Sequence, residues 1–122
     1  MNWIALGAWS AFLGVALGAF GAHALRQTIS ESAKAIYQTA VLYHFVHSFA
    51  LIAVGWLATN KTTGNLTHPA GLAFTIGIVL FSGSLYLLSV SGARWLGMIT
   101  PLGGLAFMAG WACLALAAGK AS

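Results

Sequence analysis

Apolar and polar positions along the chain are segregated into long blocks and do not alternate residue by residue. Four blocks contain no charged side chain, namely 2–25, 35–60, 62–93 and 95–119. Each is longer than the roughly 20 helical residues that cross a bilayer's hydrocarbon core. A transmembrane barrel would require alternating strands of about ten residues, which these runs do not show. The pattern predicts an all-α integral membrane bundle of four transmembrane helices in a single domain, 1–122, with helices at about 3–25, 33–58, 69–90 and 95–118.

The first block has an alternative interpretation as a cleaved signal peptide. Ala22-His23-Ala24 has the small residues that flank a cleavage site. No cation precedes the apolar run, however, and the run is longer than a typical signal core, so we expect a retained helix. Four spans would place both termini on one side of the membrane. The cations near the two sides are almost balanced, so their distribution does not predict which side is cytoplasmic.

The composition supports a membrane protein and argues against nucleic-acid binding. The chain is 60% hydrophobic and 5% charged, whereas soluble domains carry about 25% charged residues. The net charge is +4, but the cations occur singly, near the predicted helix ends. No basic run is interleaved with aromatic residues, so we expect no nucleic-acid partner. Cys113 is the single cysteine, which excludes an internal disulfide.

Small residues form a stripe along the first and the fourth predicted helix. The glycines that we expect to pack against other helices are Gly14, Gly18, Gly21, Gly103 and Gly110. Gly14 and Gly18 form a G-x-x-x-G pair, a spacing that lets two helices approach closely in a membrane. Two such faces on a small bundle also lead us to expect self-association.

Polar side chains are concentrated in the first half of the second predicted helix. Tyr37, Gln38, Tyr43, His44 and His47 all lie there, and the two histidines are three residues apart. That spacing brings both histidines towards one side of a helix. Polar groups at membrane depth are costly, so each needs a bonding partner or a functional role.

The other predicted helices carry fewer polar groups. The candidate site residues in those helices are His23, Ser82, Ser84, Tyr86, Thr100 and Pro101. We expect the serines to bond to their own helix or to a neighbouring one, which contributes about 0.6 kcal/mol for each bond. Pro101 lacks an N–H and crowds the carbonyl of Gly97, so it predicts a kink or a local opening.

The histidines allow several kinds of chemistry. If His23, His44 and His47 approach one another, they could ligate haem iron in the bundle core. They could instead hold a quinone head group or relay protons together with Tyr37 or Tyr43. A transition metal is less well supported, because no acid or thiolate completes a ligand set. We favour neutral histidines that bond across helices, with no metal site and no cofactor.

The sequence does not contain the residue sets of common enzyme classes. There is no buried acid to orient a histidine, no Ser-His-Asp set and no glycine-rich loop followed by lysine. We therefore expect no enzymatic activity. A carrier would need a charged or broken helix at the membrane midplane. An oligomeric channel or carrier remains a third alternative.

Several motifs are similar to those of one known family. They are Gly18-Ala19-Phe20-Gly21-Ala22-His23, Tyr37-Gln38-Thr39 with His47, Leu80 to Tyr86, and Thr100-Pro101-Leu102-Gly103-Gly104 with Ala109-Gly110-Trp111. On these motifs the chain resembles the domain of unknown function 423 family (YgdD/YwdK-like and transmembrane protein 256-like small membrane proteins). The resemblance implies four transmembrane helices and a bacterial inner (plasma) membrane location, and no settled activity. It also implies one polar region near one membrane side, formed by His23, Gln38, His47, Ser82, Ser84, Tyr86, Thr100 and Pro101.

These observations favour a small, non-enzymatic membrane protein of unknown biochemical activity. We expect it to act through helix packing, lipid contact or association with a membrane complex. Its expected partners are membrane lipid and a second copy of the chain or a larger complex. A redox or proton-handling protein that binds haem, quinone or metal through intramembrane histidines is the principal alternative.

Overall fold

The computed structural model describes residues 1–60, 62 and 64–121. Its helices are, in chain order, α1 (Trp3–His23), α2 (Glu31–Leu57), α3 (Thr67–Gly77), the π-helical stretch η2 (Ile78–Ser82), α4 (Gly83–Ser91), the 3-10 helix η3 (Arg94–Met98) and α5 (Thr100–Ala121). Because α3, η2 and α4 run on without a break, they form one span. Among these described residues, four helical segments are long and apolar enough to cross a membrane, which confirms the predicted fold class.

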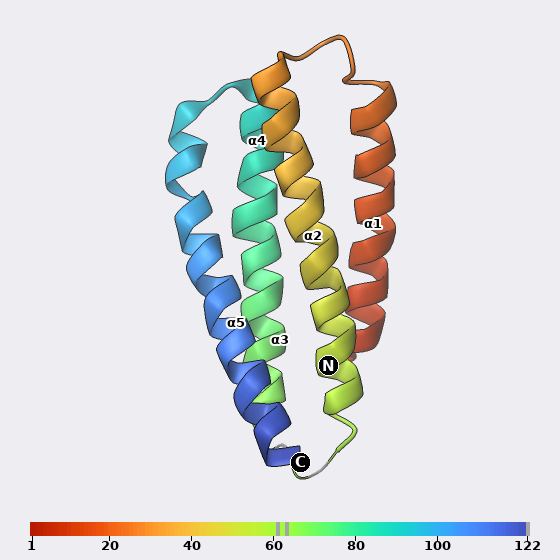
Figure 1. The fold of residues 1–122 in the computed structure, drawn as a ribbon, viewed down its shortest axis with the longest axis vertical. Helices are drawn as coiled ribbons and strands as arrows, with labels where there is room; N and C mark the ends of the chain where they lie inside the picture. Colours follow the sequence, from red (N-terminus) through yellow and green to blue (C-terminus); the bar gives the residue numbers. More distant parts are fainter. Residues whose placement is uncertain (61, 63, 122) are drawn as a thin grey trace.

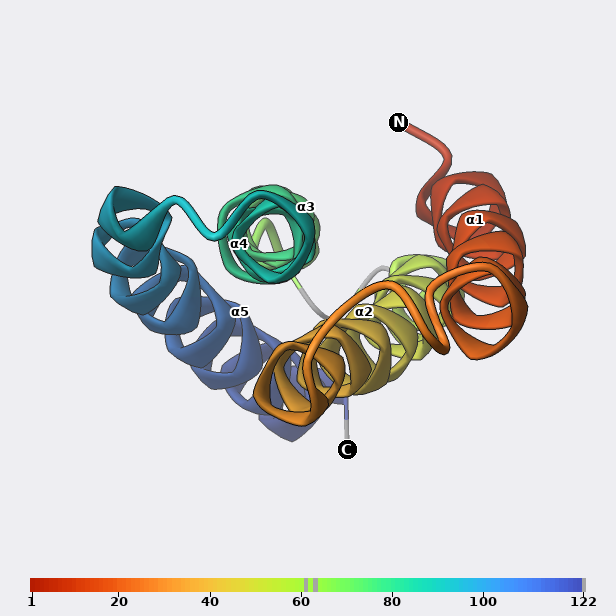
Figure 2. The same ribbon diagram turned by 90° about the horizontal axis from the view of Figure 1, so that it is seen from above.

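The spans are arranged around α2, which packs against all the other spans. Figure 2 shows α1 on one flank of α2 and α5 on the opposite flank, where α5 also lies beside the continuous α3–η2–α4 helix. The principal helix pairs are α1 with α2 and α3 with α5. Both termini lie at the same end of the bundle (Figure 1), as predicted. The α1–α2 connection and the α4–η3 turn lie at the opposite end.

Local capping explains where several helices begin and end. The Asn2 side chain accepts a hydrogen bond from Ala5 N at 3.0 Å at the start of α1. Ser30 Oγ accepts one from Ala33 N at 3.1 Å at the start of α2. This cap extends α2 two residues before its predicted start, because it satisfies one of the free N–H groups of the first turn. Gly92 ends α4 with a φ of +70°, a conformation that favours glycine.

The third span differs from the regular helix that the sequence predicted. At η2 the N–H of Gly83 bonds to the carbonyl of Ile78, five residues earlier. This π-helical turn accommodates one more residue than an α-helical turn. It changes the direction in which the following side chains point, and Ser84 and Tyr86 lie just beyond it.

The fourth span is interrupted near its start. The 3-10 helix η3 ends at Met98, and α5 begins at Thr100. Pro101 therefore occupies the first turn of α5, where its missing N–H requires no helical partner. The predicted irregularity is present, but it is a break before Pro101 and not a bend at that residue.

The two stripes of small residues face different helices. On α1, a Cβ built at Gly7 would lie 2.7 Å from the carbonyl oxygen of Ser48, and one at Gly14 would lie 3.1 Å from the Phe45 ring. Gly18 and Gly21 also face α2. On α5, Gly103 faces the backbone of Phe81 in η2, and Gly110 faces the Phe74 ring in α3. Glycine thus permits the close α1–α2 and α5–α3 contacts.

Candidate functional site

A continuous chain of hydrogen bonds joins α1, α2 and α4 inside the bundle. His44 Nδ1 lies 2.8 Å from the Tyr86 hydroxyl, and His44 Nε2 lies 3.1 Å from Ser10 Oγ. Ser10 Oγ lies 2.6 Å from Ser48 Oγ, which donates to the carbonyl oxygen of His44 at 2.8 Å. His44 and Ser48 are buried, and both are hydrogen-bonded within the protein. The network therefore connects three helices through α2.

The number of protons on each group determines which group donates and which accepts in every bond of this network. Ser48 uses its one proton for the His44 carbonyl, so it accepts the proton of Ser10. Ser10 must then accept from His44 Nε2–H, and in a neutral imidazole Nδ1 is left to accept from Tyr86. The protons run from Tyr86 through His44, Ser10 and Ser48 and end on a backbone carbonyl. Every N–H and O–H proton of these four side chains is used in a hydrogen bond. The last acceptor is a backbone carbonyl, which cannot pass a proton on.

His47 forms a second interhelical contact, to α5. Its Nδ1 lies 2.7 Å from the carbonyl oxygen of Tyr43, which can only accept, and its Nε2 accepts from the Trp111 indole N–H at 3.0 Å. The His47 ring also stacks on Phe107 with ring centroids 3.5 Å apart and an interplanar angle of 7°. His47 is therefore the Nδ1–H tautomer, with both nitrogens engaged.

Two further polar contacts hold helices together. The buried Tyr37 donates its hydroxyl proton to the carbonyl of Leu17 at 2.5 Å, which joins α2 to α1. Ser84 Oγ lies 2.6 Å from Thr100 Oγ1, which joins α4 to the start of α5. These bonds and the histidine bonds connect every span to at least one neighbour through polar groups.

Ser82 behaves differently from the other serines. Its hydroxyl is fully buried and has no hydrogen-bond partner among the described residues. We expected the serines in this cluster to bond to their own helix or to a neighbour, and for Ser82 that expectation is wrong. Ser82 closes the π-helical stretch, where carbonyls are displaced from the positions that an α-helix offers to a serine.

Alanine variants of Ser82 and Ser48 should differ in stability, although both lose one buried hydroxyl. Ser82→Ala is expected to leave the unfolding free energy unchanged or to raise it, because an unsatisfied buried hydroxyl is removed. Ser48→Ala is expected to lower it by about 1–2 kcal/mol, because it breaks two bonds. Equilibrium unfolding in mixed micelles measures both, and equal losses in the two variants would contradict the assignment.

The structure separates the remaining predicted site residues. His23, Gln38 and Pro101 are exposed, and their side chains have no hydrogen bond to another described residue. His23 lies at the end of α1 and takes no part in the hydrogen bonds of the His44 network. No group of three or more His, Cys, Asp or Glu side chains within the described parts of the chain is placed to hold a metal ion. The polar residues thus form several separate interhelical contacts and not one common region.

Three residues of these contacts, Ser10, Ser48 and Trp111, were not among the site residues predicted from the sequence. Ser10 is the only strongly polar side chain between Trp3 and Ala22, which is a usable signal. Ser48 lies four residues after His44 and so shares its helical face. Trp111 lies in the middle of α5, away from the interface where tryptophan usually gathers, so its N–H must find a partner inside the bundle.

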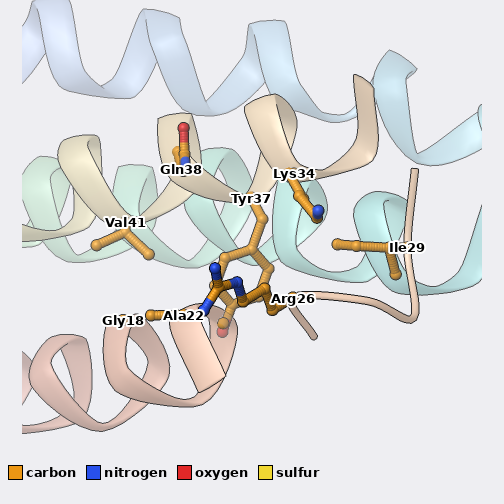
Figure 3. Close-up of a pocket in the computed structure, with 9 residues that line it drawn as sticks. Gly18, Ala22, Arg26, Ile29, Lys34, Tyr37, Gln38 and Val41 are labelled. Atoms are coloured by element: carbon orange, nitrogen blue, oxygen red, sulfur yellow. The ribbon is translucent and has the colours of Figure 1, made fainter. Parts of the chain in front are cut away.

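Three hollows lie beside these contacts in the described part of the chain, and one of them, of about 390 Å³, is lined by Ser10, His44 and Tyr86 among apolar side chains. The other two differ in their lining. One is a groove of about 810 Å³ between α2 and α5, lined by Tyr43, His47 and Trp111 among mostly apolar side chains. The other is a cavity of about 380 Å³ where α1 ends and α2 begins (Figure 3). Arg26 and Lys34 line this second cavity, which gives it a positive charge.

Comparison with known proteins adds a family to this architecture. Residues 17–104 match the family described as Protein of unknown function (DUF423). The chain is similar to UPF0382 membrane protein YwdK of Bacillus subtilis, with 46% identity over 96% of this chain and 95% of the relative. It is also similar to a UPF0382 membrane protein of Staphylococcus epidermidis, with 42% identity over 93% of this chain and 92% of the relative.

A third relative is UPF0382 inner membrane protein YgdD of Escherichia coli K12, with 38% identity over 89% of this chain and 82% of the relative. No solved structure matches the chain. The match to the family and the four apolar spans confirm the resemblance and the membrane location predicted from the sequence. The chain therefore belongs to the DUF423 family, as an integral protein of the bacterial inner membrane.

Proposed function

We propose that this protein is a non-enzymatic membrane protein that acts through contact with lipids and association with other membrane components. The proposal is supported above all by the hydrogen bonds of the buried histidines, which occupy all of their ring nitrogens. Both ring nitrogens of His44 and of His47 bond to groups of the protein itself. They act as fixed interhelical connectors, and neither presents a free lone pair to a substrate.

Haem ligation fits this arrangement poorly. An iron atom needs the lone pair of an unprotonated ring nitrogen. In His44 that nitrogen accepts from Tyr86, and in His47 it accepts from Trp111. Ligation would break one interhelical bond and leave a buried hydroxyl or indole N–H without a partner. Each histidine that became an axial ligand of the iron would therefore cost the bundle one hydrogen bond between helices.

The outer surface supports contact with lipids and with other proteins. Large apolar side chains are exposed on every span, for example Phe12, Phe49, Val79 and Leu105. In a membrane this surface faces acyl chains or the helix of a neighbour. Lipid, a second copy of the chain and a larger membrane complex are the partners that we propose for this surface.

The α2–α5 groove favours quinone binding as a second candidate function. Its volume is about 810 Å³. The Tyr43 side chain lines the groove, and its hydroxyl has no hydrogen-bond partner in the described structure. A quinone carbonyl could accept that proton while its ring stacked on neighbouring aromatic side chains. The groove would then hold the head group, and its tail would extend into the lipid.

The proposal is tested on protein purified in mild detergent from haem-replete cells. The absorption spectrum of this protein is expected to show no Soret band, either oxidised or after reduction with dithionite. Solvent extraction is expected to yield phospholipid, with quinone far below one molecule per chain. A Soret band that disappears in His44→Ala or His47→Ala would contradict the proposal. Stoichiometric quinone that disappears in Tyr43→Phe would establish the second candidate instead.

A further inference from the structure

The cavity at the α1–α2 end of the bundle is lined by basic side chains on one part and by apolar residues on another. Arg26 follows α1, while Lys34 and Gln38 lie in the first two turns of α2, and all three line the cavity. Figure 3 shows Arg26 beside the Tyr37 ring, with Lys34 on one side and Gln38 farther along α2. The apolar part of the lining includes Gly18, Ala22 and Val41, which belong to the membrane-spanning helices.

The charges in this cavity are only partly compensated. Lys34 Nζ lies 2.9 Å from Glu31 Oε1, but the Glu31 side chain is 90% exposed and does not line the cavity. Arg26 has no hydrogen bond or ion pair with any described residue, and neither has the amide of Gln38. Two cations and one nearby carboxylate leave the cavity with one excess positive charge and with free N–H donors.

The position of the cavity determines what kind of anion can use these donors. It lies at the end of two spans, where a bilayer's head groups begin. The apolar lining of the cavity belongs to the spans themselves, with Gly18 in α1 and Val41 in α2. A ligand there can place an anion beside Arg26 and continue as an apolar chain along α1 and α2. A phospholipid has both parts.

We propose that this cavity binds the phosphate of an anionic phospholipid. The guanidinium of Arg26 can donate two parallel hydrogen bonds to phosphate oxygens, and Lys34 and Gln38 can add further donors. A zwitterionic head group would bring an ammonium into a cavity that no carboxylate lines. The inference rests on the proposed function, because it specifies the lipid contact by which the protein acts.

Native mass spectrometry of the full chain tests this site. Protein is equilibrated with equal amounts of phosphatidylglycerol and phosphatidylcholine that carry the same acyl chains. The unmodified chain is expected to retain phosphatidylglycerol preferentially. Arg26→Gln is expected to lower that preference about fivefold, because one basic group near a membrane surface contributes about that factor. Glu31→Gln is expected to raise the preference, because it releases Lys34.

Arg94→Gln is the matched control. Arg94 is an exposed arginine at the same end of the bundle, it lies outside the cavity, and the substitution makes the same charge change. It is expected to leave the lipid preference unchanged. Equal losses in Arg26→Gln and Arg94→Gln would attribute the preference to the overall positive field and overturn the site.

Two other outcomes would also overturn the inference. If inorganic phosphate at millimolar concentration displaces phosphatidylglycerol, the cavity binds free phosphate and not a lipid. If the unmodified chain shows no head-group preference, the cavity binds no anionic lipid. Neither outcome affects the claim that the histidines are structural, which the absorption spectrum and the quinone extraction test separately.

Discussion

Replacing Gly103 with alanine is expected to lower the unfolding free energy by about 3 kcal/mol, the upper part of the usual range for overpacked sites. A Cβ at this position would lie 2.8 Å from the Cα of Phe81 and closer still to its backbone nitrogen. A side chain could rotate away, but the backbone of η2 cannot move without separating α5 from the third span. Equilibrium unfolding in mixed micelles measures the change.

Gly97→Ala provides the control for this prediction. Gly97 precedes α5 in η3, and no atom outside its own stretch of helix lies within 4 Å of a Cβ built there. The same added methyl group should therefore leave stability unchanged. If Gly103→Ala and Gly97→Ala prove equally stable, α5 does not approach η2 as closely as the structure describes.

The second large effect is expected for His44→Ala. The substitution removes the acceptor for Tyr86 and the donor for Ser10, and it leaves a void at the centre of the α1–α2–α4 contact. The lost hydrogen bonds and the void together should cost about 2–4 kcal/mol. His44→Phe fills the void without restoring the bonds, so it should recover part of the loss and not all of it.

His23→Ala is the matched control among the histidines. His23 is exposed at the end of α1 and bonds to no other described residue. Its replacement should leave the midpoint of unfolding unchanged. A His44→Ala variant as stable as His23→Ala would show that the hydrogen-bond network contributes nothing to the stability of the bundle.

The spans could be predicted from the sequence because their signal is local. Four blocks without charge give four helices, and Asn2, Ser30 and Gly92 mark helix ends by well-understood capping chemistry. The break before Pro101 was also signalled. The π-helical stretch was not, because its cause is not a local preference of Ile78–Ser82, which resembles any other apolar helical segment.

The candidate site was predictable only in part. His44, His47 and Tyr37 stand out because polar groups in apolar spans need partners. Which partner each finds depends on how the helices rotate about their axes, and the sequence pattern does not determine that rotation. Ser10 and Trp111 complete the two histidine contacts from helices that lie 34 and 64 residues away in sequence. For the same reason the sequence could not show that His23 lies apart from the other histidines.

Nitrogen NMR of isotope-labelled histidine in lipid bilayers tests the central claim most directly. The hydrogen-bond accounting predicts two neutral rings with opposite tautomers, protonated at Nε2 in His44 and at Nδ1 in His47. Ser10→Ala should shift the His44 signals and leave those of His47 in place. A charged ring, a ring exchanging between tautomers, or a ring nitrogen bound to a metal or cofactor would contradict the account that these histidines serve only to join helices.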